Sequence, residues 1–197
     1  MRTRSKLVLA GIGATLLMAL AIGTASARNL SISNQSFRGT FNNLEFTVEG
    51  ISTTTCRVTL EGSLHTRTID KTPGTLIGNI TRVITGQCNP NQVTILTETL
   101  PWNVRYSGFS GRLPNITLLI IHSRAAFRVS VCLSGEIIQG RFSRDPNTGE
   151  LVLGSIPSQV VPATGPFCFP GRGVFRSNGN GSVFLLGSNT RVSVTLI

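Results

Sequence analysis

The chain has 197 residues, of which 40% are hydrophobic and only 13% are charged, a composition that excludes a disordered polar protein. Its 18 Lys and Arg residues against 8 Asp and Glu residues give a formal net charge of +10. With two His and four Cys residues and no Cys-x2-Cys spacing, the sequence also disfavours a zinc-binding protein.

The N-terminal segment, residues 1–27, has the three parts of a secretory signal peptide. Three basic residues precede an apolar run at residues 7–22, and the segment ends in Ala25-Ser26-Ala27. We expect cleavage after Ala27. An uncleaved anchor helix is the alternative, which we disfavour because the run is shorter than the about 20 apolar residues that span a bilayer. No transmembrane helix is expected after cleavage.

The rest of the chain, residues 28–197, is predicted to form a single domain with an excess of arginine. Three of the 18 cations lie in the leader, so 15 remain against 8 acidic residues. Arginine binds phosphate and carboxylate well, which makes an anionic envelope polymer a candidate partner. A genome rich in arginine codons is the simpler explanation. The arginines are scattered rather than clustered, so no specific nucleic-acid binding is expected.

Alternating apolar and polar residues predict strands with one face in water, and Gly, Pro and Asn turns separate them. The fold class is therefore all-β, an antiparallel sandwich or barrel of many short strands. The apolar run at residues 118–121 predicts a central strand, and the prolines between 157 and 173 predict irregular or edge structure. The apolar positions predict one core: Val58, Leu60, Trp102, Val104, Tyr106, Leu118, Ile120, Val129, Val131, Val192 and Val194.

All four cysteines lie after the leader, and an even number in an exported chain predicts two disulfides. Four cysteines allow three pairings, which the sequence does not distinguish. We favour the sequential pairing, in which each bond stabilises the fold by about 3–4 kcal/mol. The pairs would be Cys56–Cys88 and Cys132–Cys168.

One predicted strand, residues 56–68, has a polar face. If Gly62 does not bend the strand, Glu61 and His65 share that face and would suit a base and the group that orients it. A solvated outer face of a sheet has the same alternation, and we favour this interpretation. The candidate polar face consists of Arg57, Glu61, His65 and Arg67, with Thr59 and Ser63 between them.

The sequence contains no motif that assigns a catalytic, cofactor-binding or metal-binding residue. It has no Gly-x-Ser-x-Gly nucleophile turn, and the cysteines are assigned to disulfides. His122 follows an apolar strand and is expected to make a local hydrogen bond. No cofactor is predicted, and an enzyme is less favoured than a binding protein.

Four segments resemble a group of uncharacterised exported bacterial all-β proteins. The segments are CRVTLEG at 56–62, LPW at 100–102, GRLPNIT at 111–117 and RVSVTLI at 191–197. Because no activity is known for that group, the resemblance implies bacterial export and no mechanism.

Three hypotheses about function follow. The first is a non-enzymatic secreted or envelope-associated β domain that binds anionic envelope polymers. The second is a secreted hydrolase of an envelope polymer that uses acids such as Glu61. The third is an outer-membrane β-barrel, which also alternates by two but usually has more aromatic residues than the 6% here.

Overall fold

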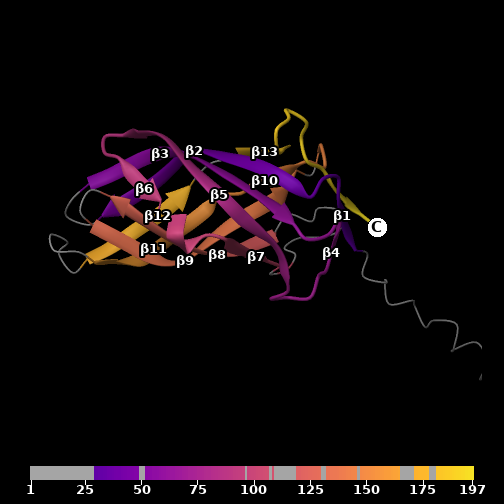
Figure 1. Ribbon diagram of the computed structural model, residues 1–197, viewed down its shortest axis with the longest axis horizontal. Coiled ribbons are helices and arrows are strands. Elements are labelled where there is room, and N and C mark those ends of the chain that lie inside the picture. The colour runs from indigo at the N-terminus through magenta and orange to yellow at the C-terminus, as the bar shows by residue number, and fades with distance from the viewer. Residues whose placement is uncertain are drawn as a thin grey trace, which may run out of the picture.

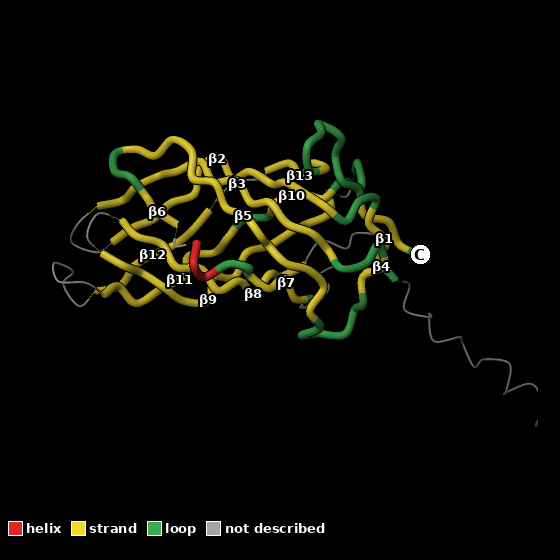
Figure 2. Tube along the Cα trace, in the orientation of Figure 1, coloured by secondary structure: helices red, strands yellow, loops and turns green. Residues whose placement is uncertain are grey.

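The computed structural model describes residues 29–48, 52–95, 97–106, 108, 119–129, 132–145, 147–164, 171–177 and 181–197, with the backbone alone over 119–129 and 132–141. This part of the chain is almost entirely strand, which confirms the predicted all-β class (Figure 2). The elements are β1 (Leu30–Ile32), β2 (Ser36–Val48), β3 (Ser52–Leu64), β4 (Thr68–Ile69), β5 (Leu76–Asn89), β6 (Val93–Ile95), a 3-10 turn at Thr97–Thr99, β7 (Trp102–Arg105), β8 (Leu119–Val129), β9 (Cys132–Arg144), β10 (Leu151–Leu153), β11 (Ile156–Thr164), β12 (Gly171–Ser177), β13 (Gly181–Leu185) and β14 (Val194–Leu196).

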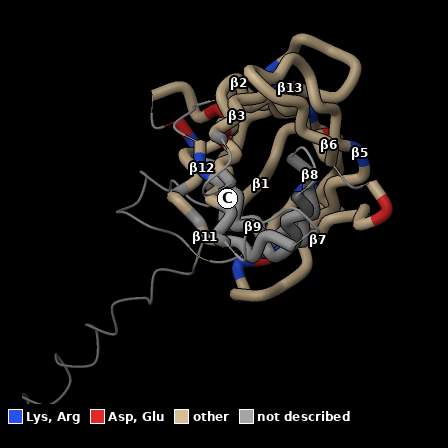
Figure 3. Tube along the Cα trace, turned by 90° about the vertical axis from the view of Figure 1, so that its left-hand side faces the viewer, with Lys and Arg blue, Asp and Glu red and all other residues tan. Residues whose placement is uncertain are grey.

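Most strands belong to one antiparallel sheet, in which β2, β3 and β5 are consecutive neighbours. One edge of β2 pairs with β3, and the other pairs first with β13 and then with β12. Strand β9 likewise pairs with β8 on one edge and with β10 and β11 on the other. Because β7 also lies beside β8, the sheet curls round on itself instead of separating into two stacked layers (Figures 1 and 3).

Several strands are longer than the sequence indicated. Strands β2 and β9 have 13 residues each, and β5 has 14. Strand β3 also has 13 residues, as many as the predicted strand at residues 56–68, but it begins and ends four residues earlier. Glycines and polar residues inside these strands take part in the ladders with neighbouring strands, so they do not end the strands. The first part of the proline-containing stretch also forms a strand, β11, which ends at Thr164 and in which Pro162 pairs with Arg172 of β12.

Apolar side chains fill the inner face of the curled sheet. Strand β2 contributes Phe37, Phe41 and Phe46, which are at most 3% exposed, and the Phe37 ring packs edge-on against Phe142 at 5.3 Å between centroids. Six predicted core residues are confirmed as buried, and Leu60 is partly buried against them. The six are Val58, Trp102, Val104, Tyr106, Val192 and Val194. The predicted core side chains at 118, 120, 129 and 131 lie outside the described ones.

A second, three-stranded sheet of β1, β4 and β14 lies at one end of the curled sheet (Figure 1). It joins residues from both ends of the chain, because Leu30 pairs with Leu196 on one side and with Ile69 on the other. Leu30 and Ile69 are buried in the same core as the large sheet. The small sheet therefore covers one end of that core.

One predicted disulfide is confirmed. Cys56 of β3 is bonded to Cys88 of β5, and the two residues are also direct partners in the ladder between these strands. The second predicted bond, between Cys132 and Cys168, lies outside the described side chains, as does His122. The predicted leader, residues 1–27, is also outside the described residues.

Candidate functional site

Strand β3 keeps its alternation from Thr54 to Leu64, so its polar face is continuous. Gly62 does not reverse the parity, because the extra residue at this level belongs to β5, where the ladder skips residue 81. Arg57, Thr59 and Glu61 therefore all lie on the outer face of the sheet, as the alternation predicted.

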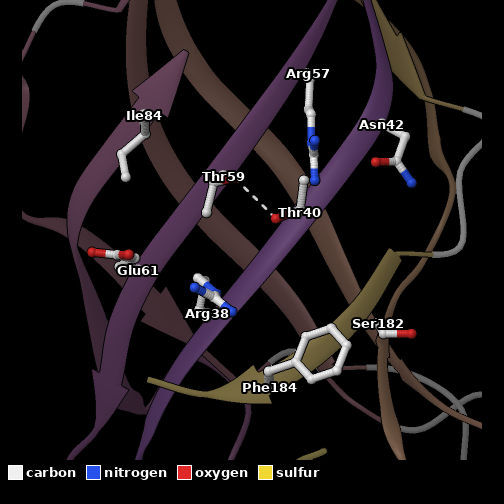
Figure 4. Close-up of a pocket in the computed structure, with 9 residues that line it drawn as sticks. All are labelled: Arg38, Thr40, Asn42, Arg57, Thr59, Glu61, Ile84, Ser182 and Phe184. Atoms are coloured by element: carbon white, nitrogen blue, oxygen red, sulfur yellow. Dashed lines mark hydrogen bonds between the residues drawn. The ribbon is translucent and has the colours of Figure 1, made fainter. Parts of the chain in front are cut away.

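The neighbouring strand β2 adds a second polar row to this face. Arg38 is the ladder partner of Glu61, and Thr40 is the partner of Thr59. The hydroxyl oxygens of Thr40 and Thr59 are hydrogen-bonded at 2.9 Å. Figure 4 shows this threonine pair lying between the side chains of Arg38 and Arg57.

These two rows line an open hollow of about 480 Å³ on the outside of the sheet (Figure 4). Strand β5 contributes Ile84 to one margin, and β13 contributes Ser182 and Phe184 to the other. We call this feature the arginine hollow. Its lining residues are Arg38, Thr40, Asn42, Arg57, Thr59, Glu61, Ile84, Ser182 and Phe184.

The charge of the arginine hollow is positive. Its one carboxylate, Glu61, forms an ion pair with Arg82 at 3.2 Å, and the Glu61 side chain is 14% exposed. Within the described part of the chain, Arg38 and Arg57 form no ion pair. The hollow thus has two arginines that form no ion pair with a described residue, on a face open to solvent.

Two β-bulges meet at Arg57. On the β2 side, Asn42 and Asn43 together lie opposite this one residue. On the β5 side, Gly86 and Gln87 together lie opposite it as well. Bulges bend a strand and re-aim its side chains, and they are frequent beside functional sites. Arg57 of the predicted polar face therefore lies opposite a bulge in each of its two neighbouring strands.

Gly86 leaves room for the Arg57 stem. A Cβ atom built on Gly86 would lie 3.2 Å from the backbone oxygen of Arg57 and 3.4 Å from its Cβ atom. A larger residue would therefore press on the strand at the point where Arg57 emerges. The bulge and the glycine together determine where the Arg57 side chain leaves the strand.

The other two residues of the predicted polar face lie elsewhere. His65 follows the end of β3, and its Nε2 atom is 3.0 Å from the Nδ2 atom of Asn79. Arg67 lies in the turn before β4, where its backbone oxygen accepts a hydrogen bond from Ile32. Glu61 is bonded to Arg82 instead of His65, so the expected base and orienter do not form a hydrogen-bonded pair.

Arg38, Thr40 and Asn42 were not predicted from the sequence as site residues. The signal was present, because these residues alternate with Phe37, Gly39 and Phe41 in β2. The cross-strand register that places them beside β3 was not deducible from either strand alone.

Among the described residues, no three His, Cys, Asp or Glu side chains gather as potential metal ligands. No helix in this part of the chain is long and apolar enough to span a membrane. A scan against protein-family models and searches of curated proteins and of solved structures found no match to this chain.

Proposed function

We propose that the chain is an exported, non-enzymatic β domain that holds an anionic polymer of the cell envelope on the outer face of β2 and β3. The predicted leader supports export. The Cys56–Cys88 disulfide is typical of an oxidising, extracytoplasmic environment.

The observation that carries this proposal is the pair of arginines in the arginine hollow. Arg38 and Arg57 reach the same open face, and neither forms an ion pair with a described acidic residue. A guanidinium offers five donors in a planar fork that matches carboxylate, sulfate and phosphate groups. The threonine pair between the arginines adds hydroxyls that can contact the same ligand.

Binding is favoured over hydrolysis. A glycosidase uses two carboxyl groups about 5–10 Å apart, one of which is protonated at neutral pH. Among the described residues, Glu61 is the one carboxylate that lines the hollow, and it is already bonded to Arg82. No histidine is among the described residues that line the hollow, so none of them offers an imidazole as a general base.

The test is binding of the purified protein to dextran sulfate and to uncharged dextran, which differ in charge on the same backbone. We expect binding to dextran sulfate alone. The double variant Arg38→Gln/Arg57→Gln should weaken it at least about tenfold, because each charge-assisted hydrogen bond contributes about 1.5–3 kcal/mol.

The matched control is Arg67→Gln/Arg176→Gln, which removes the same charge from exposed positions outside the hollow. Arg67 lies beyond β3. Arg176 of β12 forms an ion pair with Glu45 of β2. The control should retain most of the affinity. Equal losses in the two double variants at intermediate salt would show that net charge alone holds the polymer and would refute a site at the arginine hollow.

A further inference from the structure

The arginine hollow continues into a second hollow on the same face. This second hollow measures about 610 Å³ and shares Asn42 and Arg57 with the first. We call it the amide hollow, and we call the two together the groove. The amide hollow is lined by Asn42, Asn43, Thr55, Cys56, Arg57, Gln87, Cys88 and Asn89.

The two halves of the groove differ in chemistry. The arginine hollow has charged groups, whereas the amide hollow has four carboxamides and one hydroxyl beside Arg57. The four amide residues Asn42, Asn43, Gln87 and Asn89 are all exposed. Within the described part of the chain, their side chains make no hydrogen bond.

The bulges explain why the amides gather here. Asn42 and Asn43 lie opposite Arg57 on β2, and Gln87 lies opposite it on β5. In a regular ladder only one residue on each side would occupy this level. The double bulge therefore places three amide residues opposite Arg57, at the junction of the two hollows.

A carboxamide has donors and acceptors, so its natural partner is a group that also has both. Sugar hydroxyls meet this condition. The oxygens of phosphodiesters and polyphosphates only accept hydrogen bonds. The amide oxygens of the groove would then face negatively charged oxygens and find no donor. Single-stranded nucleic acids also rely on aromatic platforms. Phe184 is the one aromatic residue in the described lining, and Arg191 lies over its ring at 5.9 Å.

We propose that the ligand of this groove is an acidic polysaccharide, with its anionic group at Arg38 and Arg57 and its hydroxyls at the amide hollow. This inference rests on the proposed function, since it names the class of the anionic polymer. Arg57 contacts both halves and would set the register of the sugar chain along β2 and β3.

The experiment measures equilibrium binding of the purified protein to polygalacturonate and to polyphosphate at equal charge concentration and equal salt. Polygalacturonate has both carboxylates and hydroxyls, whereas polyphosphate has charge alone. We expect polygalacturonate to bind at least about tenfold more tightly, as two or more neutral hydrogen bonds of about 1 kcal/mol each would give.

Variants then separate the two halves of the groove. Asn43→Ala/Gln87→Ala should weaken polygalacturonate binding about tenfold and leave polyphosphate binding unchanged, whereas Arg57→Gln should weaken both. Asn103→Ala/Asn147→Ala changes two exposed amides outside the groove and should change neither affinity. Thermal unfolding of each variant at the wild-type temperature confirms that the fold is intact.

The outcomes distinguish the two proposals. If the amide variant binds polygalacturonate like wild type while Arg57→Gln weakens both polymers, the polysaccharide inference is overturned and the anion site stands. If polyphosphate binds as tightly as polygalacturonate, the polysaccharide inference is likewise overturned and the anion site stands. If the protein binds neither polymer, the proposed function fails together with the inference.

Discussion

Val104 and Asn103 are adjacent residues of β7 that face opposite sides of the sheet. Val104 is 1% exposed, and Asn103 is exposed. We expect Val104→Asp to lower the free energy of unfolding by several kcal/mol, roughly 3 or more, because it buries an unpaired carboxylate. Asn103→Asp should change it by less than about 0.5 kcal/mol. Chemical denaturation measures both, and equal losses would contradict the inward parity of β7.

Tyr106 is the one tyrosine of the chain and is 2% exposed. Burial raises its pKa to about 12 from an ordinary value of 10.0. The folded protein therefore keeps the phenol proton at a pH where the unfolded chain has released it. The stability that the neutral phenol contributes is complete below about pH 10 and is lost as the pH rises through about 12.

The absorbance of tyrosinate measures this titration directly, since no other tyrosine contributes. We expect the folded protein to titrate near the raised value and to unfold at a lower denaturant concentration as the pH increases above about 10. Tyr106→Phe should remove the tyrosinate signal and flatten that part of the stability profile. A midpoint at the ordinary pKa while the protein remains folded would contradict burial of the phenol.

At the scale of elements, the Cys56–Cys88 disulfide between β3 and β5 joins residues 32 positions apart. We expect Cys56→Ala/Cys88→Ala to lower the free energy of unfolding by about 3–4 kcal/mol, because the unfolded chain regains the entropy of an open loop. Denaturant titration of the wild type and the variant gives the difference. A loss below about 1 kcal/mol would show that the adjacent ladder already restricts this loop in the unfolded state.

The same variant tests the second predicted disulfide. Cys132 and Cys168 are then the remaining cysteines, so alkylation of the non-reduced variant reports their state alone. If they are bonded, as the even cysteine count predicts, no thiol reacts before reduction. Two alkylated thiols in the folded variant would show that this pair is not bonded.

Much of β3 was predictable from its own residues. Alternation placed Val58 inside and Arg57 and Glu61 outside, because a strand has a fixed period of two. The first disulfide followed from the cysteine count and the exported context, although its pairing was one of three choices. Both inferences depend on local periodicity or on simple counting.

The groove itself depended on information that no single strand contains. A bulge is a mismatch between two strands, so the level at which Asn42 and Asn43 oppose Arg57 exists only once the register is set. No bounds were predicted for β5, which includes Gly78 and Gly86. In the structure they allow close contact with Ser63 and Arg57 of the neighbouring strand.

At the scale of the whole molecule, the proposed binding site lies on the outer surface of the curled sheet. Barrels that bind small ligands usually enclose a cavity. Here the described inner side chains, among them Phe37, Phe41, Phe46 and Trp102, pack into one core, and the small sheet of β1, β4 and β14 covers one end. Both described hollows open on the outer face. An elongated polymer suits such a face because it can lie along the strands.

The net charge of the chain predicts how that binding responds to salt. The part of the chain after the predicted leader has 15 Lys and Arg residues against 8 acidic residues, and this excess attracts anionic polymers at long range. Screening limits such attraction to about 8 Å at physiological ionic strength and to about 3 Å at 1 M salt. We therefore expect retention on purified cell envelopes to fall steeply as salt increases. We expect the scattered arginines to supply much of this attraction and the groove to supply the contacts that persist at intermediate salt.

The measurement compares envelope retention of the wild type, Arg38→Gln/Arg57→Gln and Arg67→Gln/Arg176→Gln over a salt series. At low salt, the two double variants should lose similar amounts of retention, because each lacks two charges. At intermediate salt, the control should remain bound while the groove variant is released, since short-range contacts to arginine resist screening. Retention that ignores salt in all three proteins would contradict electrostatic capture. Absence of retention at any salt would refute envelope binding and leave the arginine excess as a property of composition.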